Sequence, residues 1–225
     1  MHRKQFGADL GLLIVTAIWG ATFVSVKYAV EVFPVFGFLT IRFWLALLCL
    51  APVAAARLWR RRGRPAIRRR ELGAGALIGL ALFAGYAFQT FGLRLTTPAK
   101  AGFITGLSVV LVPLFSAALL RRPPGPHALA GVSLATVGLG LMSLQGNLSV
   151  MMGDLIVLAC AVSFALHIVA VGAYSPAMDS LTLITVQIGT VALLSTLASL
   201  ALEQPWPAIE PATLRAAAFT GVAAT

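Results

Sequence analysis

The chain alternates between long apolar runs and short polar connections. We expect seven runs to be membrane-spanning helices, at residues 10–29, 35–56, 72–93, 99–120, 127–145, 153–174 and 180–202. An eighth run begins near Thr213 and reaches Thr225, and its length of about 13 residues is below the ~20 that a helix needs to cross the hydrocarbon core. The runs are evenly apolar, whereas barrel strands alternate, so helices are favoured. The pattern predicts an all-α polytopic membrane protein, truncated within its eighth helix.

Composition supports a lipid environment and excludes an ordinary soluble domain. Apolar residues make up 59% of the chain, charged residues make up 11%, and the mean hydropathy is +0.93. A soluble domain cannot cover so much apolar surface with polar groups. The two cysteines, Cys49 and Cys160, lie within apolar runs and form neither a disulfide framework nor a metal-binding spacing. We therefore expect no cofactor and no metal.

The distribution of basic residues predicts the orientation in the membrane. Most of the 17 lysines and arginines lie before the first run, between the second and third runs, and after the fourth. The opposite connections, EVFP, TTPAK, QGNLS and EQPWPAIEP, are nearly free of basic residues. The positive-inside rule places the N-terminus in the cytoplasm. We expect the protein to lie in the inner (plasma) membrane of a bacterial cell. The arginine-rich loop at 57–70 could suggest a nucleic-acid partner, but we interpret it as an anchor on anionic lipid headgroups.

A weak internal repeat relates the two ends of the chain. Shifting residues 9–50 by 145 positions aligns Asp9 with Asp154 and Thr40 with Thr185. The second copy would begin after five crossings, and repeats with an odd number of helices are necessarily inverted. Inverted repeats are typical of secondary transporters, whose sites lie near the bilayer midplane. The same shift aligns Arg42 with Gln187.

Several segments together are similar to a known family. They are IWGATFVSVKYAV, FLTIRFWLALLCLAP, RLTTPAKAGFITGLSVVLVPLFSAALLRRPPGPHALAGVSLATVGLGLM and GDLIVLACAVSFALHIV. Their order and composition resemble the EamA-like permeases of the drug/metabolite transporter (DMT) superfamily. The resemblance implies a ten-helix bundle built from two inverted five-helix repeats. The first repeat would cover 1–146, and the second, incomplete at 147–225, would hold helices six, seven and part of eight. Members of the family move amino acids, other metabolites or drugs, often outward.

Arg42 is the sharpest candidate for substrate binding. It lies about 12 Å along a helix from Pro34, where a guanidinium is costly in lipid and should face protein or water. It could bind a carboxylate or phosphate through two hydrogen bonds, or it could be a structural arginine that snorkels to the surface. The other residues that we expect to line a central cavity are Tyr86, Gln89, His167 and Gln187, with Trp19 as an apolar wall.

Lys27 is a further candidate for substrate binding, and Lys27, Gln89 and His167 each have a structural alternative. Lys27 either snorkels to the outer surface or lies at the outer mouth of a polar cavity, and Gly20 on the same helix face suggests that it faces protein. Gln89 either bonds to a neighbouring helix or lines the path. His167 is either a packed, hydrogen-bonded residue or a proton carrier.

Acidic residues lie only at or near the ends of the runs. A cavity with Arg42 and without a carboxylate favours neutral, zwitterionic or anionic cargo over organic cations. We therefore expect a permease or exporter of small metabolites such as amino acids, working by alternating access. A multidrug efflux permease and a non-transporting truncated fragment remain alternatives. An intramembrane enzyme is disfavoured because no nucleophile–base pair or phosphate-binding loop stands out. The sequence does not decide between a monomer and a homodimer.

Overall fold

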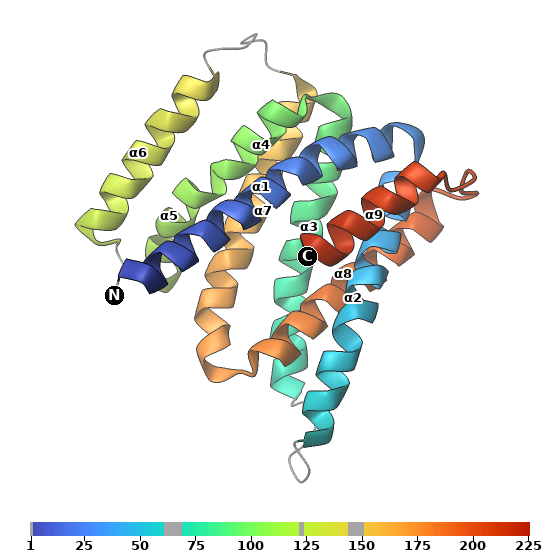
Figure 1. The fold of residues 1–225 in the computed structure, drawn as a ribbon, viewed down its shortest axis with the longest axis horizontal. Coiled ribbons are helices and arrows are strands. Elements are labelled where there is room, and N and C mark those ends of the chain that lie inside the picture. Colours follow the sequence, from blue (N-terminus) through green and yellow to red (C-terminus); the bar gives the residue numbers. More distant parts are fainter. Residues whose placement is uncertain (1, 61–68, 122–123, 144–150) are drawn as a thin grey trace.

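The chain forms a bundle of long helices (Figure 1). The computed structural model describes residues 2–60, 69–121, 124–143 and 151–225, and these contain no strand. The helices are α1 (His2–Val32), α2 (Val35–Arg60), α3 (Arg69–Leu95), α4 (Pro98–Gly106), α5 (Ser108–Leu120), α6 (Pro126–Ser143), α7 (Met152–Tyr174), α8 (Ser180–Leu202) and α9 (Pro211–Ala223), with a 3₁₀ turn at Ser175–Ala177. The all-helical expectation is confirmed for the described residues.

Six helical segments in the described part of the chain are long and apolar enough to cross a bilayer. They are Gly11–Val32, Val35–Arg57, Arg69–Leu95, Pro98–Leu120, Met152–Tyr174 and Ser180–Leu202. The fifth expected run, 127–145, corresponds to α6, whose apolar stretch Leu129–Gly138 is shorter. Consecutive long helices run in opposite directions in Figure 1, as expected of a polytopic membrane protein.

Proline and glycine set the helix boundaries. Pro34 separates α1 from α2, and Pro98 opens α4 behind Thr97, whose hydroxyl accepts a hydrogen bond from the Lys100 N–H at 3.3 Å. The expected span at 99–120 is divided at Leu107 into α4 and α5. The interruption thus precedes Pro113, which lies inside α5.

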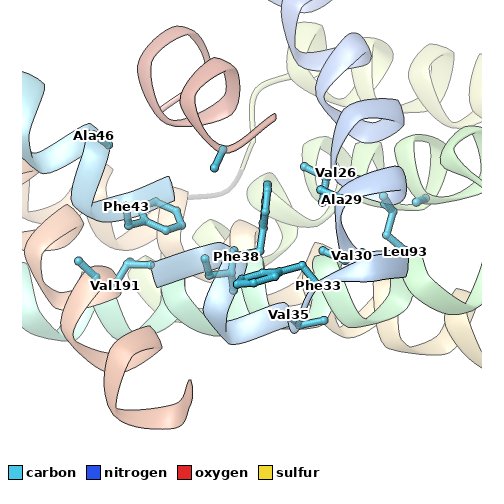
Figure 2. Packing of buried hydrophobic residues seen from close by; sticks show 14 of the residues in the cluster. Val26, Ala29, Val30, Phe33, Val35, Phe38, Phe43, Ala46, Leu93 and Val191 are labelled. Atoms are coloured by element: carbon cyan, nitrogen blue, oxygen red, sulfur yellow. The ribbon is translucent and has the colours of Figure 1, made fainter. Parts of the chain in front are cut away.

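The core lies where α2 packs against its neighbours. Figure 2 shows Phe38 and Phe43 of α2 among buried side chains from α1, α3 and α8. Both phenylalanines are fully buried, as is Val30 of α1. Lipid gives no hydrophobic gain for helix association, so close packing must supply the attraction. Small residues allow that approach: a Cβ added at Gly79 of α3 would lie 2.7 Å from the Cβ of Thr190 in α8.

The helices α2 and α8 contact each other at both ends. Glu203, just after α8, accepts hydrogen bonds from the backbone N–H groups of Phe36 at 3.0 Å and Gly37 at 2.8 Å in the first turn of α2. Arg57, near the end of α2, pairs with Asp179, the N-cap of α8, at 3.1 Å. Glu203 therefore satisfies N–H groups at the N-terminus of α2, where free N–H groups need acceptors, and Arg57 pairs with the carboxylate that caps α8.

Candidate functional site

Arg42 is a buried cation about two turns from the start of α2, with 3% of its surface exposed. Its Nε and Nη2 atoms donate to the Oγ1 of Thr225 at 3.3 and 3.2 Å. No ion pair among the described residues includes Arg42. A buried charge without a counter-charge is strongly unfavourable, so this guanidinium is ready to accept an anionic group.

Two aromatic rings lie against the guanidinium, and a third ring packs on one of them. Its Cζ atom lies 4.5 Å from the ring centroid of Tyr86 and 5.2 Å from that of Phe43. Tyr86 of α3 makes edge contacts with Phe43, at a centroid distance of 4.9 Å, and with Phe164 of α7, at 5.2 Å. The negative ring faces partly compensate the positive charge without neutralising it. Arg42 and Tyr86, both expected in the site, therefore lie together.

His167 and Gln187 form a second polar pair, between α7 and α8. The Nε2 atom of His167 and the Oε1 atom of Gln187 lie 2.9 Å apart. Gln187 is buried and His167 is partly buried. Gln187 belongs to α8, which packs along α2, the helix of Arg42. A mid-span amide needs such a partner, since lipid offers none.

The remaining expected site residues lie elsewhere. The Nε2 atom of Gln89 donates to the Thr105 hydroxyl at 3.4 Å and so connects α3 with α4. The ammonium of Lys27 donates to the backbone oxygen of Arg94 at 3.1 Å and pairs with Glu31 at 3.4 Å, at the ends of α1 and α3. Trp19 of α1 is 57% exposed, so it does not pack into the cluster around Arg42.

Sequence reasoning missed two features of the structure. Phe164 and Thr225 contact Tyr86 and Arg42, respectively, and nothing in their spacing marked them. The second feature is a cavity of about 320 Å³ at the end of the bundle where α1 meets α2, apart from the cluster around Arg42. It is lined by Glu31, Val32, Phe33, Pro34, Arg94, Glu203 and Pro207. The sequence signal that could have indicated this cavity is the presence of charged residues and prolines in and beside the connections that carry almost no arginine.

Fold and site together define a polytopic helical membrane protein with buried polar groups between its helices. Residues 6–144 match the EamA-like transporter family, and this is more than half of the chain. The chain belongs to the EamA-like transporter family of the drug/metabolite transporter superfamily.

Similar proteins carry the same description. A protein of Archaeoglobus fulgidus described as an uncharacterized transporter is 37% identical over 172 residues, covering 76% of this chain and 51% of that protein. The Bacillus subtilis protein described as the uncharacterized transporter YetK is 27% identical over 192 residues, covering 81% of this chain and 57% of that protein. The chain thus spans about half the length of the curated relatives it matches.

A solved structure has a similar fold. It is described only as "Crystal structure of protein", and it superposes with a TM-score of 0.63 at 21% sequence identity. The match covers 92% of this chain and 75% of that one. At this identity the likeness concerns the fold alone.

Proposed function

We propose that the protein is an inner-membrane secondary transporter of small metabolites such as amino acids, and that Arg42 binds the carboxylate of the cargo. The observation that carries the proposal is the burial of Arg42, at 3% exposure, against hydroxyl and aromatic groups and with no carboxylate partner among the described residues. A planar guanidinium binds a carboxylate through two parallel hydrogen bonds. The proposed role is binding and movement of cargo without a catalytic step.

Helix packing supports the proposed inverted repeats at 1–146 and 147–225. A Cβ on Gly79 of α3 would lie 3.0 Å from the backbone oxygen of Gln187, and a Cβ on Gly221 of α9 would lie 2.5 Å from that of Arg42. Arg42 and Gln187 are the residues that the 145-residue shift aligns. The helix contacts are also reciprocal between the proposed repeats. Helix α3 of the first repeat packs against α7 and α8 of the second, while α9 of the second repeat packs against α1 and α2 of the first.

This pairing favours alternating access as the mechanism. Two inverted halves can rock about a site near the membrane midplane, so that the site opens to each side in turn. Arg42 and Gln187 would then approach one cavity from related positions on α2 and α8. We place the N-terminus in the cytoplasm, because the arginine-rich connection 57–70 follows α2 on that side.

The charge of the site favours amino acids over organic cations. The aromatic side chains of Tyr86, Phe43 and Phe164 alone would suit a cationic drug. Arg42 lies against two of these rings and would repel such a ligand. A zwitterion or an anion instead gains a counter-charge, so small metabolites with a carboxylate fit better than cationic drugs.

The proposal is tested by replacing Arg42. The purified full chain in lipid nanodiscs is titrated with a ¹⁴C-labelled mixture of L-amino acids, and binding is measured at equilibrium. We expect Arg42→Leu to weaken the tightest binding about 100-fold, as for a lost charged hydrogen-bonded pair, and Arg42→Lys to weaken it less. Arg215→Leu, which removes an exposed arginine of α9, is the matched control.

Thermal unfolding separates binding from folding in this experiment. Arg42 has no carboxylate partner among the described residues, so its replacement by leucine should leave the midpoint of unfolding unchanged or raise it. Unchanged amino-acid binding by a folded Arg42→Leu protein would show that the arginine is structural, and the proposed role of Arg42 would be wrong.

A further inference from the structure

The cavity at the end of the bundle is separate from the cluster around Arg42. Its walls come from the link between α1 and α2, the last turn of α3 and the segment that follows α8. With a volume of about 320 Å³, it lies at the lower end of the size range of small-molecule sites. It lies on the side of the connections that carry almost no arginine, which is the outer side in the proposed orientation.

Charges of both signs line this cavity. The carboxylate of Glu203 is occupied by the N–H groups of Phe36 and Gly37 and by the Ser199 hydroxyl, which donates at 3.2 Å. The guanidinium of Arg94 and the carboxylate of Glu31 are more accessible, with Arg94 exposed and the Glu31 side chain 48% exposed. The cavity therefore offers a cationic group and an anionic group to a small ligand.

Lys27 holds these two charged residues near each other. Its ammonium donates to the backbone oxygen of Arg94 at 3.1 Å and pairs with Glu31 at 3.4 Å. The contact fixes the end of α1 against the end of α3. A ligand with opposite charges on neighbouring atoms could therefore meet both side chains at once, whereas a simple cation or anion would meet one attractive and one repulsive group.

A layer of buried apolar side chains lies between the cavity and Arg42. Pro34 lines the cavity, and Arg42 lies eight residues further along the chain, about 12 Å down α2. Phe38 and Leu39, between them on α2, are fully buried. Figure 2 shows Phe33, which lines the cavity, beside Phe38 in this layer. The cavity and the cluster around Arg42 are therefore two separate places along α2.

We propose that the cavity is a peripheral binding site for zwitterionic amino acids, with Arg94 attracting the carboxylate and Glu31 attracting the ammonium group. The proposal rests on the proposed function, because it assumes that amino acids are the cargo. Binding here would hold the ligand on the outer side of the apolar layer, about 12 Å from Arg42 along α2. Exposed charges bind weakly, so this site should have the lower affinity of the two.

The experiment measures the site in the absence of the central one. The full-length Arg42→Leu protein in nanodiscs is titrated with the ¹⁴C-labelled amino-acid mixture, and we expect weak saturable binding to remain. Adding Arg94→Gln and Glu31→Gln should weaken this remaining binding about tenfold. The control adds Arg215→Gln and Glu210→Gln, two exposed residues outside the cavity. Glu203 is left intact because its replacement would disturb α2.

Competition defines the ligand class. Unlabelled L-2-aminobutyrate should displace the label from the Arg42→Leu protein, while propylamine and butyrate, which each keep one of its charged groups, should be at least tenfold weaker. If butyrate or propylamine competes equally well, the cavity does not select zwitterions and the proposal is wrong.

The two proposals fail in different ways. If Arg42→Leu leaves no saturable binding, or if the remaining binding is insensitive to Arg94→Gln and Glu31→Gln, the peripheral site is refuted while Arg42 keeps its role. If instead Arg42→Leu binds as tightly as the unaltered protein, the central site is refuted. If the unaltered protein binds no amino acid, both proposals fall.

Discussion

Gly79 shows how one residue sets the distance between two helices. It lies in α3 where that helix meets α8, and an added Cβ would approach the Cβ of Thr190 to 2.7 Å and the oxygen of Gln187 to 3.0 Å. Neither atom is the end of a flexible side chain. Gly73, in the same helix, has nothing within 4 Å of such a Cβ. A substitution at Gly79 therefore tests close helix packing, while the same substitution at Gly73 tests helix propensity alone.

We predict that Gly79→Ala lowers the stability of the protein and that Gly73→Ala does not. Overpacking at a close helix contact costs about 1–3 kcal/mol, while alanine is the better helix former when the site is open. The midpoint of thermal unfolding of each purified variant, followed by circular dichroism, measures the difference. Equal midpoints for the two variants would mean that α3 and α8 are further apart than described.

The side-chain partners within the candidate site could be predicted only in part. The 145-residue shift pairs Arg42 with Gln187, and the spacing from Pro34 places Arg42 deep in the bilayer. The shift gives no hint that Gln187 bonds with His167, because that contact depends on how α7 and α8 are rotated about their axes. Such rotations are set by packing of small residues such as Gly79, which sequence spacing does not resolve.

At the scale of helices, Glu203 joins the end of α8 to the beginning of α2. Its two oxygens accept from the N–H groups of Phe36 and Gly37, at 3.0 and 2.8 Å. These groups belong to the first turn of α2, where N–H groups have no partner within the helix and the helix dipole favours an anion. Glu210 occupies the N-cap of α9 but makes no side-chain cap bond.

We predict that Glu203→Leu destabilises the protein by about 1–2 kcal/mol, the usual cost of a lost helix cap. Glu203→Gln, which keeps one acceptor oxygen but no charge, should lie between this variant and the unaltered protein. Glu210→Leu is the control and should change little. Thermal unfolding of the three variants in one detergent makes the comparison, and equal effects of Glu203→Leu and Glu210→Leu would contradict the capping role.

Helix positions were more predictable than helix continuity. The expected spans at 35–56, 153–174 and 180–202 lie close to α2, α7 and α8, because a long apolar run in lipid must satisfy its own backbone groups. The break at Leu107 was not expected. An apolar run gives no sign of an interruption that neighbouring helices can stabilise.

At the scale of the whole molecule, the connections between helices divide into two sets. The link from α8 to α9 carries Glu203 and Trp206, whereas the links after α2 and α5 carry arginines. Hydropathy and this asymmetry were enough to predict a polytopic helical protein. They could not predict that α9 packs against α1 and α2, because lipid-facing and protein-facing helix surfaces are almost equally apolar.

We predict that the link from α8 to α9 faces the cell exterior and that the turn after α7 faces the cytoplasm. Ala208→Cys and Pro176→Cys, each placed in a chain with Cys49→Ala and Cys160→Ala, put single exposed thiols on these two segments. A membrane-impermeant maleimide added to intact cells should label only the first, and both after lysis. Labelling of Pro176→Cys alone in intact cells would show that the orientation is opposite to the one predicted.

The bond between Glu203 and Gly37 has a consequence for biosynthesis. The two residues are 166 positions apart, so α2 leaves the ribosome long before its acceptor exists. At 5–20 residues per second, the interval is about 8–30 s. During that time the N–H groups at the start of α2 must be satisfied by water or lipid headgroups at the bilayer surface. The insertion machinery therefore receives a half-built bundle whose second helix is completed only when α8 arrives.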